Sequence, residues 1–113
     1  MREDVLIKNI KQYLKYARIA HEEEDYNTSL VLFFKTLTAI CDLKIFRDKG
    51  IIPSNHAHRF RILENEYPAI YKILDRDFPY YTETYELEIK KETAELVKKD
   101  AENLLKEVGG EDW

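Results

Sequence analysis

The chain has 113 residues, a length typical of one domain with a single hydrophobic core. Hydrophobic residues make up 44% of it and charged residues 35%, a balance that excludes an intrinsically disordered chain. The net charge of -4 argues against a protein that coats nucleic acid through overall positive charge, because lysine and arginine drive phosphate binding.

The few chain-breaking residues favour helices. Three glycines and three prolines are spread among many Lys, Glu, Leu, Ile and Tyr residues, which favours long helices and argues against a sheet. The single cysteine, Cys41, excludes an internal disulfide and a zinc site built from several thiolates. The first residues show neither a signal peptide nor a membrane span. We therefore expect a soluble cytoplasmic protein, without cofactor, in which residues 1–113 form a single domain.

The first half of the chain predicts two helices joined by a short turn. From Asp4 to about Glu24, apolar residues recur at spacings of three and four, which predicts an amphipathic helix. Residues 25–27 interrupt this pattern, and Asp25, Asn27 or Thr28 could each cap the next helix. The segment Leu30–Phe46 is apolar nearly all round and must be covered on all sides. We expect it to be the central helix, with part of its surface covered by a second subunit in a homodimer.

The middle of the chain predicts two shorter helices. Gly50 stands where a left-handed cap would end the central helix, and Pro53–Asn55 forms a loop with a capping residue. A third helix is predicted over His56–Glu66. Pro68 should begin a short fourth helix through Leu74, which Asp77–Pro79 should end.

The last part predicts a connector and a long helix. Residues 80–85 are an aromatic-rich connector, and the apolar spacing from Ala94 to Val108 predicts the final helix. Gly109 and Gly110 should stop it, leaving residues 109–113 as a frayed tail. The predicted fold is all-α, an antiparallel bundle of about four to five helices.

Several segments carry a resemblance to a known family. They read AHEEEDYNTSLVLFFKTL over 20–37, KGIIPSNHAHRF over 49–60, YYTETY over 80–85 and ETAELVKKDAENLLKEV over 92–108. Their order and polarity resemble the HEPN domains of prokaryotes. The resemblance implies a helical bundle that dimerises. It also implies a protein that binds RNA or nucleotide, or that pairs with a nucleotidyltransferase-like protein.

The residues of HEPN nucleases are not matched. Many HEPN proteins are metal-independent ribonucleases that use an arginine followed four to six residues later by a histidine. Here Arg47 precedes His56 by nine residues, no arginine precedes His58 at that spacing, and Arg76 has no histidine partner. The resemblance therefore implies a non-catalytic member. A divergent ribonuclease stays open, with His56, His58 and Arg59 as its candidate phosphate-binding and proton-transferring residues.

Basic residues gather in one segment, between Lys44 and Arg61, where only Asp48 opposes them. We expect them to form a basic edge that binds RNA, nucleotide or an acidic partner. The candidate ligand-binding residues are Arg47, Lys49, His56, Arg59 and Arg61. The alternative is a solvated surface, or ion pairs with the acidic run 22–25. His56 and His58 lack the spacing of a helical metal pair, so we expect no metal.

Other features have more ordinary interpretations. Tyr80, Tyr81 and Tyr85 could stack on bases, or bury their rings and bond locally. Cys41 should be an inert core residue. The stretch EEEDYNTSLVLFFKTLTAI also suggests a helical adaptor of the tetratricopeptide type, although those repeats recur at about 34 residues and no second copy is present.

Overall fold

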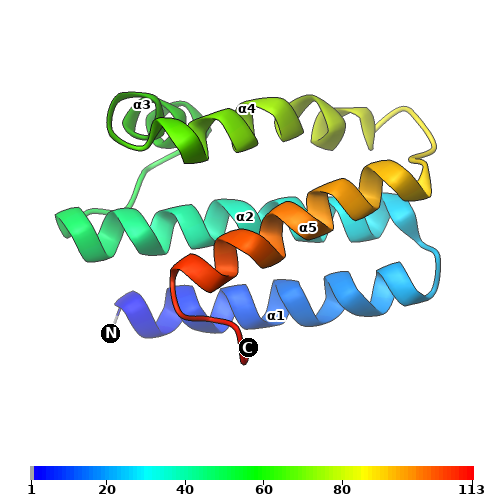
Figure 1. Ribbon diagram of the computed structural model, residues 1–113, viewed down its shortest axis with the longest axis horizontal. Coiled ribbons are helices and arrows are strands. Elements are labelled where there is room, and N and C mark those ends of the chain that lie inside the picture. The colour runs from blue at the N-terminus through cyan, green and yellow to red at the C-terminus, as the bar shows by residue number, and fades with distance from the viewer. Residues whose placement is uncertain (1) are drawn as a thin grey trace.

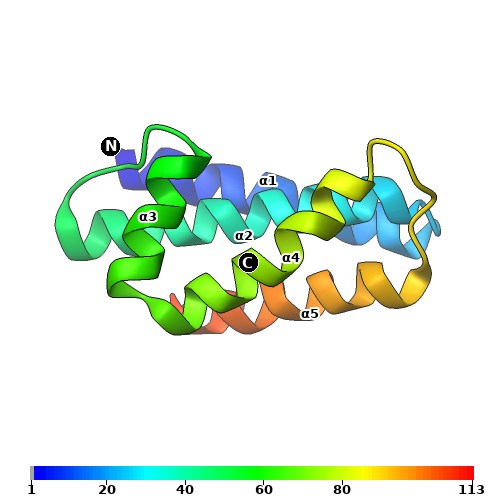
Figure 2. The same cartoon turned by 90° about the horizontal axis from the view of Figure 1, so that it is seen from above.

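Five helices form an up-and-down arrangement in the computed structural model, which describes residues 2–113. In Figure 1, α1 (Arg2–Glu22), α2 (Tyr26–Lys49), α4 (Pro68–Glu83) and α5 (Lys91–Glu107) run along the long axis in alternating directions. Figure 2 shows the short α3 (His56–Glu66) lying across them. Residues 2–113 contain no strand, which confirms the all-α prediction, and no helix among them has the length and apolarity of a membrane span.

The central helix is α2, as predicted, and it packs against α1, α4 and α5. Phe33, Leu37 and Ile40 are fully buried along it. Helices of the same chain supply this cover, so the apolar surface of α2 does not itself call for a second subunit. The helix also begins earlier than expected, at Tyr26.

Two predicted caps are confirmed. Gly50 has a φ of 74°, and its amide donates to the Phe46 carbonyl at 2.8 Å, which ends α2. At the start of α3, the side chain of Asn55 accepts a hydrogen bond from the His58 amide at 2.8 Å. These two turns fix where α3 begins, and therefore where its first side chains lie.

The prediction that α4 ends at Asp77–Pro79 is wrong. The helix continues through Pro79 to Glu83. Pro79 removes one backbone hydrogen bond, which would have reached the carbonyl of the exposed residue Asp75, where water can take its place. Continuing the helix brings Phe78 and Tyr81 onto Phe34 of α2, so packing outweighs the loss.

The C-terminal tail does not fray as expected. Trp113 packs against the core, and its carbonyl accepts a hydrogen bond from Arg18 at 3.4 Å. Lys11 lies over the indole ring at 5.7 Å. Gly110 is buried under this ring, where a Cβ atom would come within 2.7 Å of it. The absence of a side chain at Gly110 therefore allows the tail to fold back on α1.

Asn27 fastens the connector between α4 and α5. It was a candidate cap for α2, but its amide donates to the carbonyls of Thr84 and Leu87 at 3.1 and 2.7 Å. Its oxygen accepts from the Ile89 amide at 2.8 Å. One side chain thus satisfies three backbone groups of a segment that has no regular structure.

Replacing Asn27 with alanine should loosen this connector. Three hydrogen bonds to backbone groups are lost, so we expect a destabilisation of about 1–3 kcal/mol and faster amide exchange at Ile89. Urea denaturation and hydrogen exchange would measure both effects. Asn65→Ala, an exposed change on α3, is the matched control. Equal behaviour of the two variants would show that Asn27 does not hold the connector.

A buried carboxyl group joins α4 to α5. Asp77 is fully buried, and its Oδ1 accepts from Arg76 Nε at 3.1 Å, whereas Oδ2 has no hydrogen-bond donor. Arg76 also bonds Asp100 of α5. Burial, and then the neighbouring Asp100, raise the pKa of Asp77 to about 7. A proton on the Asp77 carboxyl group can be shared with Asp100, which favours the protonated form.

This carboxyl group should make stability depend on pH. Because the folded pKa of Asp77 is raised, its contribution is fully present below the unfolded pKa and is lost as pH rises through about 7. Asp77→Asn keeps a donor for Asp100, so we expect it to be more stable than the parent at pH 8, by on the order of 3 kcal/mol, and similar at pH 4. Urea denaturation across this range tests it. Asp75→Asn, an exposed neighbour, should leave the parent's profile unchanged. If the stability of Asp77→Asn and that of the parent changed with pH in the same way, the account would be contradicted.

Candidate ligand-binding cleft

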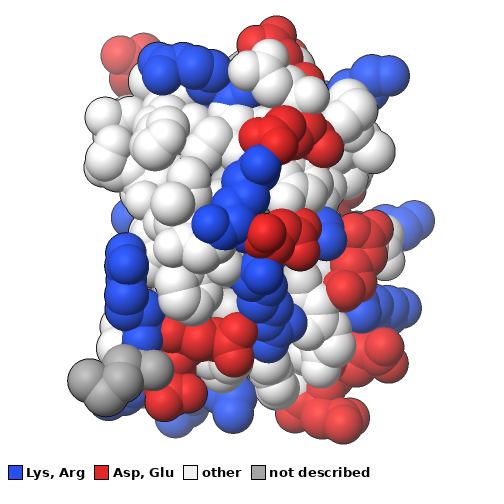
Figure 3. Space-filling model, turned by 90° about the vertical axis from the view of Figure 1, so that its left-hand side faces the viewer, with Lys and Arg blue, Asp and Glu red and all other residues white. Residues whose placement is uncertain are grey.

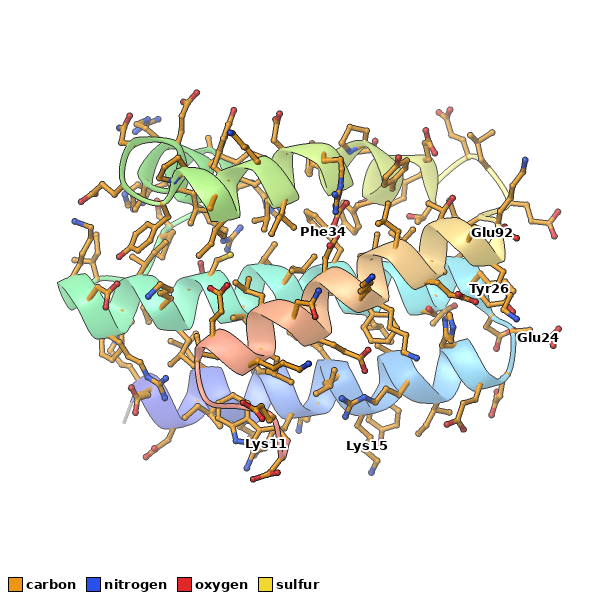
Figure 4. The ribbon with its side chains drawn as sticks, in the orientation of Figure 1. Lys11, Lys15, Glu24, Tyr26, Phe34 and Glu92 are labelled. Atoms are coloured by element: carbon orange, nitrogen blue, oxygen red, sulfur yellow. The ribbon has the colours of Figure 1, made fainter. Side chains whose placement is uncertain are left out.

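A cleft of about 240 Å³ opens between α1, α2, α3 and α4. Phe34 is part of its wall, and Figure 4 shows this side chain on α2, pointing toward α4. The cleft is rich in polar side chains, contributed by four helices. They are Asn9, Tyr13, Lys35, Thr38, Asp42, His56, Arg59 and Tyr81. We refer to it as the α1–α4 cleft.

An ion pair lies at the base of the α1–α4 cleft. Arg59 Nε donates to Asp42 Oδ1 at 2.7 Å, and its terminal nitrogen Nη2 donates to Oδ2 at 2.9 Å. The side chains are only 11% and 12% exposed. Two parallel charge-assisted bonds of this kind fix the guanidinium plane as well as its charge. The pair therefore ties α3 to α2 in one orientation.

The same guanidinium determines the state of His56. Arg59 Nη1 lies 2.9 Å from His56 Nδ1. A guanidinium can only donate, so Nδ1 must be the acceptor and the neutral ring must carry its proton on Nε2. The chain Asp42–Arg59–His56 thus sets a tautomer that coordinates alone would leave open. His56 presents an N–H donor through its remaining nitrogen.

The surroundings of His56 keep the ring neutral. The ring packs against Phe60 and Phe78 at centroid distances of 6.5 and 6.0 Å. This partial burial, and then the positive charges of Arg59 and Lys35, lower the pKa of His56 below its usual range. With Nδ1 occupied and Nε2 protonated, the ring has no free lone pair to act as a base. The geometry favours a hydrogen-bond donor over a general acid or base.

Aromatic side chains form another wall of the cleft. Tyr81 stacks on Phe34 with centroids 4.8 Å apart and planes at 17°. The exposed Tyr85 donates its hydroxyl proton to Tyr81 at 3.2 Å. Tyr81 is therefore held in place and lines the cleft, whereas Tyr80 lies in the same helix, half-buried, without lining it.

The predicted basic edge is not one continuous surface. Arg47 bonds Glu3 at 2.9 Å and the Val108 carbonyl at 3.0 Å, and Lys49 pairs with Glu66. Arg61 is exposed and has no ion pair among residues 2–113. Figure 3, which views the end of the molecule where α2 ends, shows acidic and basic side chains intermixed. Of the five candidate residues, only His56 and Arg59 come together.

The other candidates have structural roles. His58 Nδ1 accepts from the Ser54 amide at 3.1 Å, which closes the loop before α3. The two histidines do not converge, and no group of three His, Cys, Asp or Glu side chains within residues 2–113 is arranged to hold a metal. Cys41 is buried, and burial raises the pKa of its thiol, which makes it inert as predicted.

Sequence analysis missed Asp42 and Lys35. Both lie in the apolar central helix, before the basic segment that drew attention. Asp42 is buried, and a buried carboxylate requires a partner. The sequence therefore did contain one sign of this ion pair, which is an aspartate in the middle of the apolar segment Leu37–Phe46. It would have pointed to an arginine on a neighbouring helix.

A larger groove of about 700 Å³ lies between the end of α1 and α5. Figure 4 labels three of its residues, Glu24, Tyr26 and Glu92, at one end of the molecule. The groove is shallow, and lysine and glutamate alternate in its lining. His21, its histidine, is engaged by Ser29 at 3.3 Å. Its three lysines, Lys91, Lys98 and Lys99, share the lining with five glutamates, so the α1–α4 cleft, whose charged residues sum to a positive charge, is the better candidate.

Comparisons with family models, curated proteins and solved structures gave no match. The functional argument therefore depends on the residues of this chain.

Proposed function

We propose that this chain is a non-catalytic helical module that binds a phosphate-bearing ligand, a nucleotide or the end of an RNA strand, in the α1–α4 cleft. The observation that carries the proposal is the Asp42–Arg59–His56 chain, which leaves an N–H donor on His56, a residue that lines the cleft together with Lys35.

The charged side chains of the cleft are mainly hydrogen-bond donors. Both oxygens of Asp42 accept hydrogen bonds from Arg59, which neutralises the negative charge of the carboxylate. The charges of Lys35 and Arg59 exceed that of Asp42 by one, which leaves a positive site while His56 is neutral. Phosphate oxygens are strong acceptors with negative charge, and lysine and histidine N–H groups complement them. Tyr81 and Tyr13 supply aromatic surface beside the donors, which suits a base or a sugar.

The size of the cleft limits what can enter. Its volume of about 240 Å³ is below the range of roughly 300–1,000 Å³ typical of sites that enclose a drug-sized molecule. We expect it to hold one phosphate with its sugar, and the rest of the ligand to extend into solvent. A terminal nucleotide of a longer strand satisfies this condition.

As part of this proposal, we take the chain to be related to the HEPN domains that its sequence resembles. An antiparallel helical bundle is compatible with it, although many unrelated proteins share that architecture. Homodimerisation and a nucleotidyltransferase-like partner are proposals on the same basis. The α1–α4 cleft replaces the broad basic edge as the surface through which ligand would bind.

A divergent ribonuclease is the second candidate, because His56 and Arg59 meet within one chain. A ribonuclease needs a group that accepts the proton of the ribose 2′-hydroxyl. The Nε2–H tautomer of His56 cannot do so while Arg59 occupies Nδ1. We therefore expect labelled RNA to remain intact with this protein, with or without divalent metal. Cleavage that His56→Ala abolishes would favour the enzyme instead.

Ligand binding can be tested by titration. The probes are AMP, adenosine and a short oligouridylate with or without a 5′-phosphate, monitored by calorimetry or amide NMR shifts. We expect the phosphorylated probes to bind and Lys35→Ala or His56→Ala to weaken them about 10- to 100-fold, as loss of a charge-assisted bond does.

Arg61→Ala is the matched control, because it removes an exposed positive charge outside the cleft. We expect it to change binding little. Equal weakening by Arg61→Ala and Lys35→Ala would mean diffuse electrostatic attraction rather than a site. No binding of any phosphorylated probe would overturn the proposal.

A further inference from the structure

Helix α4 carries a buried carboxyl group and part of the wall of the α1–α4 cleft. Asp77 is fully buried, and its Oδ2 has no hydrogen-bond donor within residues 2–113. The next residue, Phe78, packs against His56 and Phe34, each at a centroid distance of 6.0 Å. One turn after Asp77, Tyr81 lines the cleft and stacks on Phe34. Because a helix moves as a rigid element, a displacement of α4 at Asp77 also displaces these two rings.

Three charged groups meet where Asp77 lies between α4 and α5. Arg76 donates to Asp77 at 3.1 Å and also bonds Asp100 of α5, whose side chain is 13% exposed. While Asp77 is protonated, the three groups carry no net charge. When Asp77 ionises, they carry one uncompensated negative charge, and its Oδ2 still lacks a donor. A buried carboxylate that lacks a donor is unstable, so the ionised form requires water.

The packing between α4 and α5 offers little else to hold the two helices together. Helix α4 packs on α2 and α3, α5 packs on α2, and the contact between α4 and α5 is smaller than any of these. Within residues 2–113, the one ion pair that joins them is that of Arg76 with Asp100. Water can reach Asp77 where this small contact opens, so we expect ionisation to release α4 from α5.

We propose that the protonated Asp77–Asp100 contact holds α4 in place and keeps the α1–α4 cleft formed, so that the loss of one proton regulates ligand binding. The inference rests on the proposed function, because it concerns the regulation of the same site. Burial, and then Asp100, raise the pKa of Asp77 to about 7. Because this carboxyl pKa is raised, the contact is intact at lower pH and is lost as pH rises through about 7. Ligand should therefore bind more weakly above this pH.

Other titratable groups around α4 behave differently from Asp77. On α2, burial raises the pKa of the Cys41 thiol, which therefore stays protonated, and Asp42 is paired with Arg59. On α3, the pKa of His56 lies below its usual range, and a phosphate group on a ligand has a second pKa of about 6. The His56 and phosphate titrations persist in Asp77→Asn, which cannot ionise at this position. A comparison of this variant with the parent at each pH therefore isolates the effect of the Asp77 proton.

Labelling of Cys41 by a thiol reagent tests the release of α4 without any ligand. Cys41 is buried seven residues after Phe34, on the side of α2 that α4 covers. We expect its labelling rate in the parent, divided by that in Asp77→Asn, to be constant below about pH 7. At higher pH the ratio should rise toward about 10-fold per pH unit, as the loss of one proton requires. Asp75→Asn, an exposed change in α4, should behave as the parent does.

The same rates distinguish the release of α4 from unfolding of the whole chain. Labelling of the parent should exceed, by at least about 10-fold, the rate that the unfolding equilibrium measured in urea allows at the same pH. Equal rates would mean that Cys41 becomes accessible only by global unfolding, and this result would overturn the proposal. A ratio of parent to Asp77→Asn that does not change with pH would overturn it as well.

Titration with AMP tests the effect on the α1–α4 cleft. Between about pH 6.5 and 8.5, the affinity of the parent should fall by about 3- to 10-fold relative to that of Asp77→Asn. Equal affinities of the two proteins at both pH values would contradict the regulation. If neither protein binds AMP at any pH, the proposed function fails and the regulation fails with it, whereas Cys41 labelling would still show whether the proton controls α4.

Discussion

The ion pair between Asp42 and Arg59 is the constraint on which the rest of the site depends. A carboxylate in the apolar central helix and an arginine on a transverse helix are both shielded from water, so each requires the other. Removing one partner of such a pair leaves an uncompensated charge, which costs about 3–5 kcal/mol. The pair therefore fixes the position of α3, and the N-cap at Asn55 fixes where that helix starts. His56 is placed by both.

The ion pair determines where the single N–H proton of the neutral His56 ring lies. Arg59 does not need to touch a ligand to affect it, because it holds His56 as a neutral donor. Lys35, which is exposed and lines the α1–α4 cleft, supplies positive charge, while Tyr81 and Phe34 supply a rigid aromatic wall. The cleft combines charge, a directional donor and stacking surface in a small volume. These properties support the proposed binding of a phosphate-bearing ligand, and the tautomer of His56 is the reason that we propose binding rather than catalysis.

The sequence predicted the helices better than the site, and the reason is physical. Gly50, Asn55 and the apolar spacing of α1 and α5 act within a few residues, so local rules located them. The continuation of α4 through Pro79 depends on packing against Phe34, more than forty residues away in the chain. The role of Asn27 depends on a connector about sixty residues later. No local pattern reports such contacts.

Only part of the candidate site was predicted, because some of its residues come together only in the folded chain. His56 and Arg59 were identified because they lie three residues apart in a conspicuous basic segment. Arg47 and Lys49 belong to the same segment, yet each is paired elsewhere because α1, α5 and the end of α3 bring carbonyl or carboxylate groups beside them. Asp42 and Lys35 looked like ordinary positions in the central helix until the fold placed them beside α3. Because the basic residues are close together in sequence, we predicted one continuous basic edge and did not predict the cleft.

The protonation state of His56 is the most direct test of this account. Nitrogen chemical shifts of the His56 imidazole distinguish the two neutral tautomers and follow the ring through its titration. The account predicts a single tautomer with the proton on Nε2, and a pKa below the usual range. In Arg59→Lys, which cannot hold both Asp42 and His56 in the same plane, both features should weaken. A proton on Nδ1, or a pKa at or above the usual value, would contradict the arrangement on which the proposed binding depends.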